Sequence, residues 1–157
     1  MQSKHSLRLW FTVILLMLSL LSSCQSASAP MPSADSSAES GELASGIAYG
    51  YRTYSYAEGF SFGLAVKWEM RPVGRVTVNF CAPISNRYAI SLTLHDSDDR
   101  LLGESGLLAP GNHIKEIRLA GIPPETGEIC VTIYAYDENG DVVYRTSRYE
   151  TLIRDYT

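Results

Sequence analysis

The sequence predicts an all-β fold, an antiparallel sandwich of two sheets and about seven strands. The first observation is composition: 45% of the 157 residues are hydrophobic and 19% are charged, which is typical of a globular chain. The second is a series of short segments that alternate apolar and polar residues, as strands with one buried face do. The third is the set of turn residues between these segments. Seven short strands in about 110 residues are typical of a two-sheet sandwich.

The first element along the chain is a signal peptide, predicted for residues 1–23. Lys4, His5 and Arg8 form a basic head, and an apolar run follows from Leu9 to Leu21. A helix needs about 20 residues to cross the hydrocarbon core of a bilayer. This shorter run therefore indicates a leader rather than a stable membrane span.

The leader ends in Leu21-Ser22-Ser23-Cys24, which resembles the lipobox of bacterial lipoproteins. The resemblance implies cleavage after Ser23 and transfer of a diacylglycerol to the thiol of Cys24, with palmitate typical of the attached chains. Each buried methylene contributes about 0.8 kcal/mol, so two or three acyl chains would hold the protein on the membrane. The implied location is the extracytoplasmic side of the cell membrane.

An ordinary secretory signal is the alternative, because Ala27-Ser28-Ala29 offers a cleavage site with small residues. Pro30 would follow that scissile bond, where its fixed φ and missing amide donor suit a protease groove poorly. We therefore favour lipidation of Cys24.

A flexible stalk is predicted over residues 24–46, and the folded domain over 47–157. The stalk segment is rich in Ser and Ala, contains Pro30 and Pro32, and has few large apolar residues. Such a segment buries too little surface to offset its ordering entropy.

The domain alternates with a period of two in several places. Val76, Val78 and Phe80 share one face of a strand, whereas Ile114 and Ile117 break the alternation and suggest a bulge. The predicted strands are Gly63–Met70, Arg75–Cys81, Tyr88–His95, Arg100–Leu108, His113–Leu119, Glu128–Tyr136 and Val142–Ile153.

The last two strands form a hairpin, because Asn139-Gly140 stands between them. Its register has two solutions. A two-residue loop places Arg148 on the core face, and a three-residue loop places Arg145 there instead.

Part of the domain resembles small extracellular immunoglobulin-like domains of Gram-positive bacteria. The residues that carry the resemblance are Leu107–Leu119, Gly127-Glu128-Ile129 and Asp137-Glu138-Asn139-Gly140. In those domains a Gly-Xaa-Tyr often opens the penultimate strand, and Ile129 stands here in place of the tyrosine. The resemblance implies an immunoglobulin-like sandwich and says nothing of activity.

The charge of the chain argues against nucleic acid as a partner. The formal net charge is −4, and without Lys4 and Arg8 of the leader 11 basic residues face 17 acidic ones. No block of Lys or Arg occurs, although binding to phosphates needs a concentrated basic surface. Gly-rich phosphate-binding motifs are also lacking, so no cofactor is expected.

Cys81 and Cys130 form a candidate disulfide, since exported proteins often contain disulfides. Strand alternation argues against it, because both side chains point outward on opposite sheets. A bulge before Pro83 would restore the pairing. The sequence leaves both outcomes open.

No motif points to catalysis or to a metal. His95 and His113 are the two imidazoles beyond the leader, and neither belongs to a recognisable catalytic motif. The acidic segments 95–99 and 137–141 lack the ligand spacing of a calcium loop and read as hairpin turns.

A group of aromatic residues with one arginine is the candidate interaction surface: Tyr49, Tyr51, Arg52, Tyr54 and Tyr56. Tyrosine offers an apolar face and a polar tip, which suits contact with a protein or a glycan. The alternative, which we favour, is an edge strand whose rings cover the sandwich.

The sequence thus predicts a non-catalytic binding module of the cell envelope, anchored through Cys24, with an envelope protein or a glycan as its partner. One alternative is a structural or spacer lipoprotein without a specific ligand. A more remote one is an envelope hydrolase, which would need His95 or His113 beside a carboxylate in a pocket.

Overall fold

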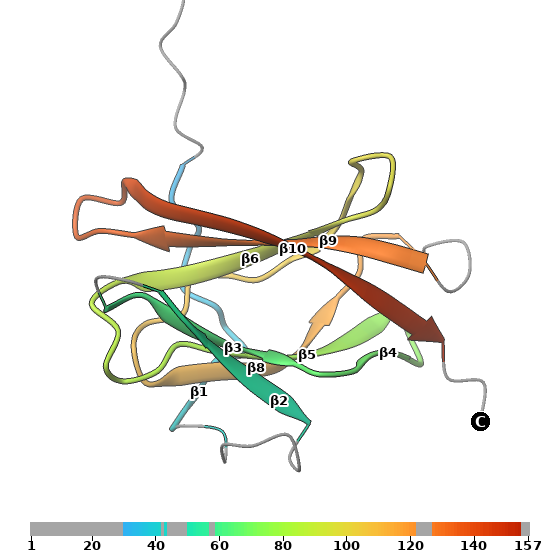
Figure 1. Cartoon of the computed structure of the whole chain (residues 1–157), viewed down its shortest axis with the longest axis horizontal. Helices are drawn as coiled ribbons and strands as arrows, with labels where there is room; N and C mark the ends of the chain where they lie inside the picture. Colours follow the sequence, from blue (N-terminus) through green and yellow to red (C-terminus); the bar gives the residue numbers. More distant parts are fainter. Residues whose placement is uncertain (1–29, 42, 44–49, 57–58, 122–126, 155–157) are drawn as a thin grey trace, which may run out of the picture.

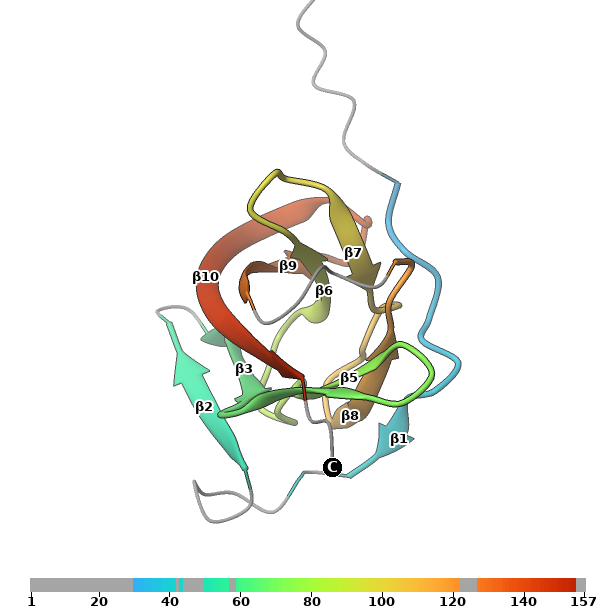
Figure 2. The same cartoon turned by 90° about the vertical axis from the view of Figure 1, so that its right-hand side faces the viewer.

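A computed structural model describes residues 30–41, 43, 50–56, 59–121 and 127–154. The all-β prediction is confirmed: within these residues ten strands form a curled, mixed sheet that resembles a half-barrel (Figures 1 and 2). The strands are β1 (Glu39–Ser40), β2 (Tyr51–Ser55), β3 (Ser61–Ala65), β4 (Trp68–Arg71), β5 (Arg75–Cys81), β6 (Ala89–His95), β7 (Leu101–Glu104), β8 (Asn112–Arg118), β9 (Gly127–Tyr136) and β10 (Val142–Arg154).

The seven-strand, two-sheet sandwich is not confirmed, because the strands of both layers belong to one sheet. Its order is β1-β8-β5-β4-β10-β9-β6-β7, and β3 joins β5 to β2. In Figure 1 β6, β9 and β10 form one layer and β3, β5 and β8 the other. The 13-residue β10 links the layers, because Leu152–Arg154 pair in parallel with Trp68–Met70 after the rest of the strand has paired with β9.

The predicted strand Gly63–Met70 is two strands. β3 pairs with β5 at Gly63 and Cys81, whereas β4 pairs with it at Met70 and Val76. Both therefore lie along the same edge of β5, β3 at one end and β4 at the other. At the β3 end, β2 is added as a further strand.

The expected bulge lies in the pairing between β5 and β8. The register shifts between Thr77 and Phe80, where Asn79 has a φ of 39°. The extra residue is on β5, and the shift lets both Ile114 and Ile117 of β8 remain buried. Broken alternation on one strand thus reflects an insertion on its neighbour.

The hydrophobic core fills the space between the layers, and burial of each large apolar side chain contributes about 1.5–3 kcal/mol. The predicted core face of Val76, Val78 and Phe80 is confirmed, because all three are fully buried. The largest fully buried side chains include Trp68, Phe62, Phe80, Leu64, Ile90 and Leu92.

The segment 33–41, called the strap below, lies along the domain, so the stalk prediction is wrong for these residues. The amide of Leu107 donates to the carbonyl of Ser33 at 2.8 Å, and the amide of Asp35 donates to Leu107 at 3.0 Å. A carboxylate oxygen of Asp35 accepts from the amide of Gly106 at 2.7 Å. A Cβ on Gly106 would meet the Cα of Asp35 at 2.5 Å, so this approach requires glycine.

The end of the strap contains β1, which covers part of the β8 edge. Glu39 pairs with His113, whose Nδ1 donates to the carbonyl of Gly41 at 2.8 Å. The ammonium of Lys115 donates to a Glu39 carboxylate oxygen at 2.8 Å. Ala38 packs against the core. The sequence gives little indication of the strap, because the strap is held by partners about 70 residues away and has no hydrophobic pattern of its own.

Candidate functional site

A groove lies between β2 and β10, on the side where β2 is the outermost strand. It has a volume of about 220 Å³. Its lining combines two cationic side chains, two aromatic rings, a carboxylate and two small apolar residues: Arg52, Tyr54, Ala65, Val66, Arg148, Tyr149 and Glu150. We call these residues the β2–β10 groove.

The register of β10 turns Arg148 toward the core side. Arg148 stands opposite Val131, which is fully buried in the core. This is the face expected from a two-residue loop, although the loop spans residues 137–141 and the register shifts between Val142 and Tyr144. The structure thus resolves the hairpin register in favour of Arg148 over Arg145.

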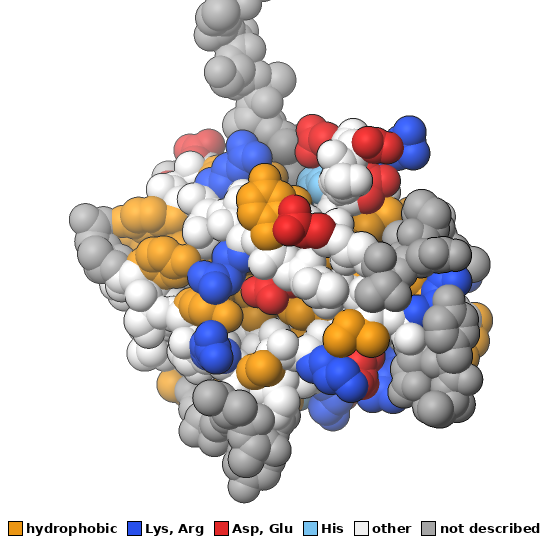
Figure 3. Space-filling view, turned by 45° about the vertical axis from the view of Figure 1, so that its right-hand side comes forward, with side chains coloured by type: hydrophobic (Ala, Val, Ile, Leu, Met, Phe, Trp, Pro, Cys, Tyr) orange, Lys and Arg blue, Asp and Glu red, His pale blue; other side chains and the backbone are white. Residues whose placement is uncertain are grey.

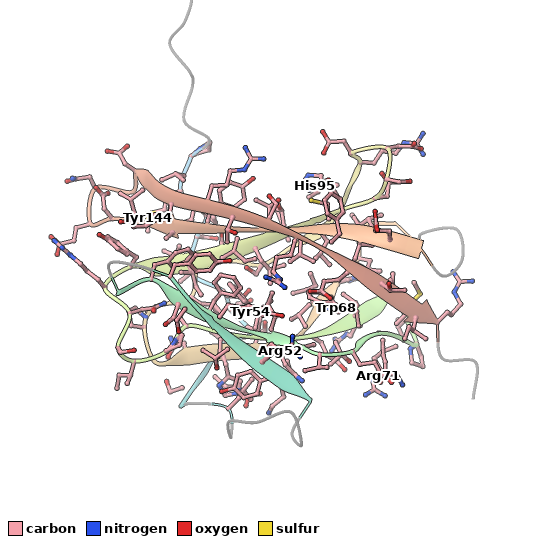
Figure 4. The ribbon with its side chains drawn as sticks, in the orientation of Figure 1. Arg52, Tyr54, Trp68, Arg71, His95 and Tyr144 are labelled. Carbon is pink, nitrogen blue, oxygen red and sulfur yellow. The ribbon has the colours of Figure 1, made fainter. Side chains whose placement is uncertain are left out.

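The residues of β2 that face β10 are held by the pairing of β2 with β3. Arg52 stands opposite Leu64 and Tyr54 opposite Phe62, and both partners are fully buried. Arg52 and Tyr54 therefore share the face of the sheet that covers the core. Figure 4 shows them between the ribbons of β2 and β10, with His95 on the other side of β10.

Side chains connect the two strands across the groove. The Tyr56 hydroxyl, just beyond β2, lies 3.3 Å from the Thr146 hydroxyl, and the Arg148 guanidinium carbon lies 4.0 Å from the centre of the Tyr54 ring. The residue numbers rise along β2 as they fall along β10, so the two strands run antiparallel beside each other. Among the described residues no ladder joins β2 to β10.

The cationic groups of the groove have few partners. The Nε of Arg148 is buried without a hydrogen bond to a described residue, and the nearest carboxylate oxygen, from Glu150, is 3.6 Å away. Arg52 is exposed and makes no ion pair with a described residue. An incompletely paired guanidinium is a ready site for a carboxylate or phosphate.

Aromatic rings continue from the groove into the core. Tyr54 contacts Phe62 with ring centres 5.4 Å apart, and Phe62 contacts Phe60 at 5.6 Å. Phe60 stacks on Tyr144 of β10 at 5.5 Å. Most of this aromatic cluster holds β2 and β3 against β10, as the edge-strand interpretation predicted.

The predicted aromatic surface is therefore divided. Tyr51 is only 6% exposed, and its hydroxyl donates to the carbonyl of Leu43 at 3.0 Å. Its ring covers Gly63, where a Cβ would meet the ring at 2.6 Å. Tyr51 is thus a packing residue, whereas Arg52 and Tyr54 line the groove and Tyr56 stands beside it. Tyr49 lies outside the described residues.

Residues of β10 were missed by sequence reasoning as a site. Tyr149 is 71% exposed, and Arg148 and Glu150 face the groove beside it. The sequence did point to Arg148, which one of the two possible hairpin registers places on the core face. The face of the molecule in Figure 3 carries hydrophobic side chains among basic and acidic ones rather than one broad apolar area.

Cys81 and Cys130 are not joined by a disulfide. Cys81 pairs with His113 on β8, and Cys130 pairs with His95 on β6 and Tyr149 on β10. They lie in different layers of the curled sheet. The outward orientation expected from alternation agrees with this separation, because neither belongs to the core cluster. Cys24 lies outside the described residues.

His113 lies beside a carboxylate, yet its ring is used to hold the strap. Its Nδ1 donates to Gly41, and its Nε2 lies 3.5 Å from Glu39. The thiol of its cross-strand neighbour, Cys81, is buried. Both ring nitrogens of His113 thus lie within reach of strap residues.

The acidic loops use their first carboxylates to close their own turns. Asp96 accepts from the amides of Asp98 and Arg100 at 2.9 Å, and Asp137 accepts from Asn139 and Asp141 at 2.9 and 3.0 Å. The hydrogen bond from the backbone of Asp141 holds the pKa of Asp137 below its usual value. Among the described residues no three His, Cys, Asp or Glu side chains are placed to hold a metal.

No family model matches the chain, and no curated protein matches it. In the part of the chain that the structure describes, no helix has the length and apolar character needed to cross a membrane.

Proposed function

We propose that the chain is a lipid-anchored, non-catalytic binding module of the bacterial cell envelope, and that the β2–β10 groove is its binding surface. One observation carries the proposal of the surface: two guanidinium groups, of Arg52 and Arg148, line the groove with one carboxylate, that of Glu150, which lies 3.6 Å from Arg148 without a hydrogen bond to its buried Nε. The immunoglobulin-like character expected from the sequence belongs to the same proposal, supported by the two layers in Figure 1.

Lipidation of Cys24 is proposed from the lipobox and the leader that precedes it. The strap shortens the distance between the anchor and the domain, because only residues 25–32 lie between Cys24 and the first hydrogen-bonded strap residue, Ser33. Eight extended residues reach about 30 Å at most. The domain is then held close to the membrane surface rather than on a long stalk.

The anchor is tested by cell fractionation of the Cys24→Ala variant. We expect the wild-type protein in the membrane pellet and the variant in the soluble fraction. Ser23→Ala keeps a small residue before the cysteine and is the matched control, which should remain membrane-bound. Retention of Cys24→Ala in the pellet would refute lipid anchoring.

The binding surface is tested by cross-linking in cells with a photoreactive phenylalanine derivative at Tyr149. The same group at Val73 is the control, because Val73 is 86% exposed and does not line the groove. We expect an adduct from position 149 that disappears when Arg52→Met is added. Equal adducts from both positions, or none from position 149, would count against the groove.

A further inference from the structure

We propose that the β2–β10 groove binds an extended peptide, which pairs with the open edge of β10 and places a carboxylate side chain between Arg52 and Arg148. This inference rests on the binding function proposed above and names the class of its ligand. Three features of the groove support it: a strand edge without a paired strand, more basic than acidic groups, and ring packing that favours a peptide over a sugar.

The free strand edge is on β10. From Val142 to Leu152 this strand pairs with β9 on one side, and β4 takes only Leu152–Arg154 on the other. Among the described residues no strand pairs with the second edge between Arg145 and Thr151; the side chains of Tyr54 and Tyr56 contact it there and must move aside for an added strand. The backbone groups that point away from β9 on this edge can form a ladder with an added strand.

The charge in the groove favours an acidic side chain. Arg52 and Arg148 supply two guanidinium groups, and Glu150 supplies one carboxylate. Because Glu150 lies 3.6 Å from the buried Nε of Arg148, it does not satisfy that donor. A carboxylate from a ligand can accept charge-assisted hydrogen bonds from either guanidinium.

The same charges make the edge selective. Inward-pointing charges on an edge strand oppose pairing with apolar strands, because such a partner would bury them unmatched. A strand that carries a carboxylate at the level of Arg148 removes this penalty. The groove therefore both rejects most strands and accepts a particular kind.

A peptide is favoured over a glycan because of how Tyr54 packs. Sugar recognition uses exposed ring faces, but Arg148 covers the Tyr54 ring and Phe62 packs against it, so Tyr149 is the one ring of the groove lining that is left exposed to a sugar. The groove volume of about 220 Å³ accommodates one or two side chains. The exposed Tyr149 flanks the same edge and can contact the peptide beyond the groove.

The test uses the full chain in detergent micelles and a pool of ten-residue peptides that is randomised except for a central glutamate. The tightest members are remade with glutamine at the centre, and separately with alternate backbone amides N-methylated. We expect each change to weaken binding at least about tenfold, which corresponds to loss of one charge-assisted bond or of the ladder. Amide exchange of residues 145–151 should slow in the complex.

Protein variants locate the peptide. Arg52→Met should weaken binding about tenfold, because it removes one charge-assisted hydrogen bond to the peptide carboxylate. Because Arg52 is exposed, its replacement should leave the fold intact. Arg145→Met is the matched control on the outer face of the same strand, where the guanidinium lies over the Tyr134 ring, and it should bind as the wild type does.

Three outcomes would overturn the inference: no pool member binds at millimolar concentration, glutamine replaces glutamate without loss, or N-methylation has no effect. Shifts of groove resonances by cell-wall oligosaccharides, with none by peptides, would also overturn it. If cross-linking at Tyr149 still depends on Arg52 in these cases, the proposed binding function survives and only the peptide assignment falls.

Discussion

Part of the β8 edge of the curled sheet is covered by a paired strand, whereas the β10 edge beside the groove has no paired strand among the described residues. The strap pairs with β8 at Asn112 and His113 and is bonded further along to Leu107. Across the groove, the described contacts of the β10 edge are made by side chains of β2 and of the residues that follow it, such as Tyr54 and Tyr56. Open strand edges invite unwanted pairing, and proteins normally cover or guard them.

The two edges are also protected by different chemistry. The covered edge uses a close glycine contact, backbone bonds and the Lys115–Glu39 ion pair. The open edge has the inward charge of Arg148, which stacks on Tyr54 and lies 3.6 Å from Glu150 but leaves its buried Nε without a hydrogen bond to a described residue. The contacts of the first arrangement hold the strap on the domain, whereas the second is where we propose that a ligand binds. Substitutions at the two edges should therefore separate stability from binding.

The largest effect is expected for Gly106→Val, which inserts atoms where the Asp35 backbone lies. Loss of the strap contacts and overpacking should lower the free energy of unfolding by about 2–3 kcal/mol. Urea denaturation measures the change, and faster amide exchange in residues 33–41 locates it. Gly121→Val is the control, because a Cβ at Gly121 meets no atom within 4 Å. Equal losses in both variants would refute the strap contact.

A smaller loss is expected for Asp35→Ala. Its carboxylate accepts from the amides of Gly106 and Ser37 at 2.7 and 2.8 Å. Removing these bonds should cost about 1–2 kcal/mol in urea denaturation. Asp98→Ala removes a carboxylate whose ion pair with Arg100 is exposed, and it should change stability by less than about 0.5 kcal/mol. An unchanged stability of Asp35→Ala would mean that these two hydrogen bonds do not contribute to holding the strap.

At the open edge, Arg148→Met should change the free energy of unfolding by less than about 1 kcal/mol, in either direction. An apolar side chain of similar length loses the stacking on Tyr54 but no longer buries an unbonded Nε. Urea denaturation checks this, and Tyr149 cross-linking in the same variant should be lost. A destabilisation as large as that of Gly106→Val would mean that Arg148 serves the fold rather than a ligand.

The fold class and most strands could be predicted from the sequence, because alternation is a local property. Val76, Val78 and Phe80 lie in the core as their spacing indicates. The strap could not be predicted, since a segment rich in Ser and Ala carries no period and Asp35 finds its partner 71 residues away. The joining of the layers was missed for a similar reason, because it depends on the length of β10 and its parallel pairing with β4.

The site was predictable in part. Arg52 and Tyr54 came from composition, but their partner Arg148 depends on a hairpin register that the five-residue loop and the shift near Val142 determine. Burial of Tyr51 depends on Gly63 and Leu43, which only the folded chain brings together. Long-range pairing, rather than residue type, therefore decides which aromatic residues are available for binding.

The smallest effect is a dependence of stability on pH at the covered edge. The hydrogen bond from Lys115, with its positive charge, holds the pKa of Glu39 below the usual 4.5. Because the folded-state pKa is the lower one, the stabilisation is complete above pH about 4.5 and is lost as the pH falls through the folded-state pKa. Glu39→Gln removes this contribution.

The measurement is the difference in urea midpoint between wild type and Glu39→Gln from pH 7 to pH 3. We expect the wild type to be more stable at pH 7 and the difference to shrink below pH about 4.5, as Glu39 becomes protonated. Asp137, whose pKa is also lowered, titrates in both proteins, so its contribution cancels. The Glu39 side chain is more than half exposed, and high salt should therefore reduce the difference. A difference that stays constant with pH would show that the ion pair does not help to hold β1 on β8.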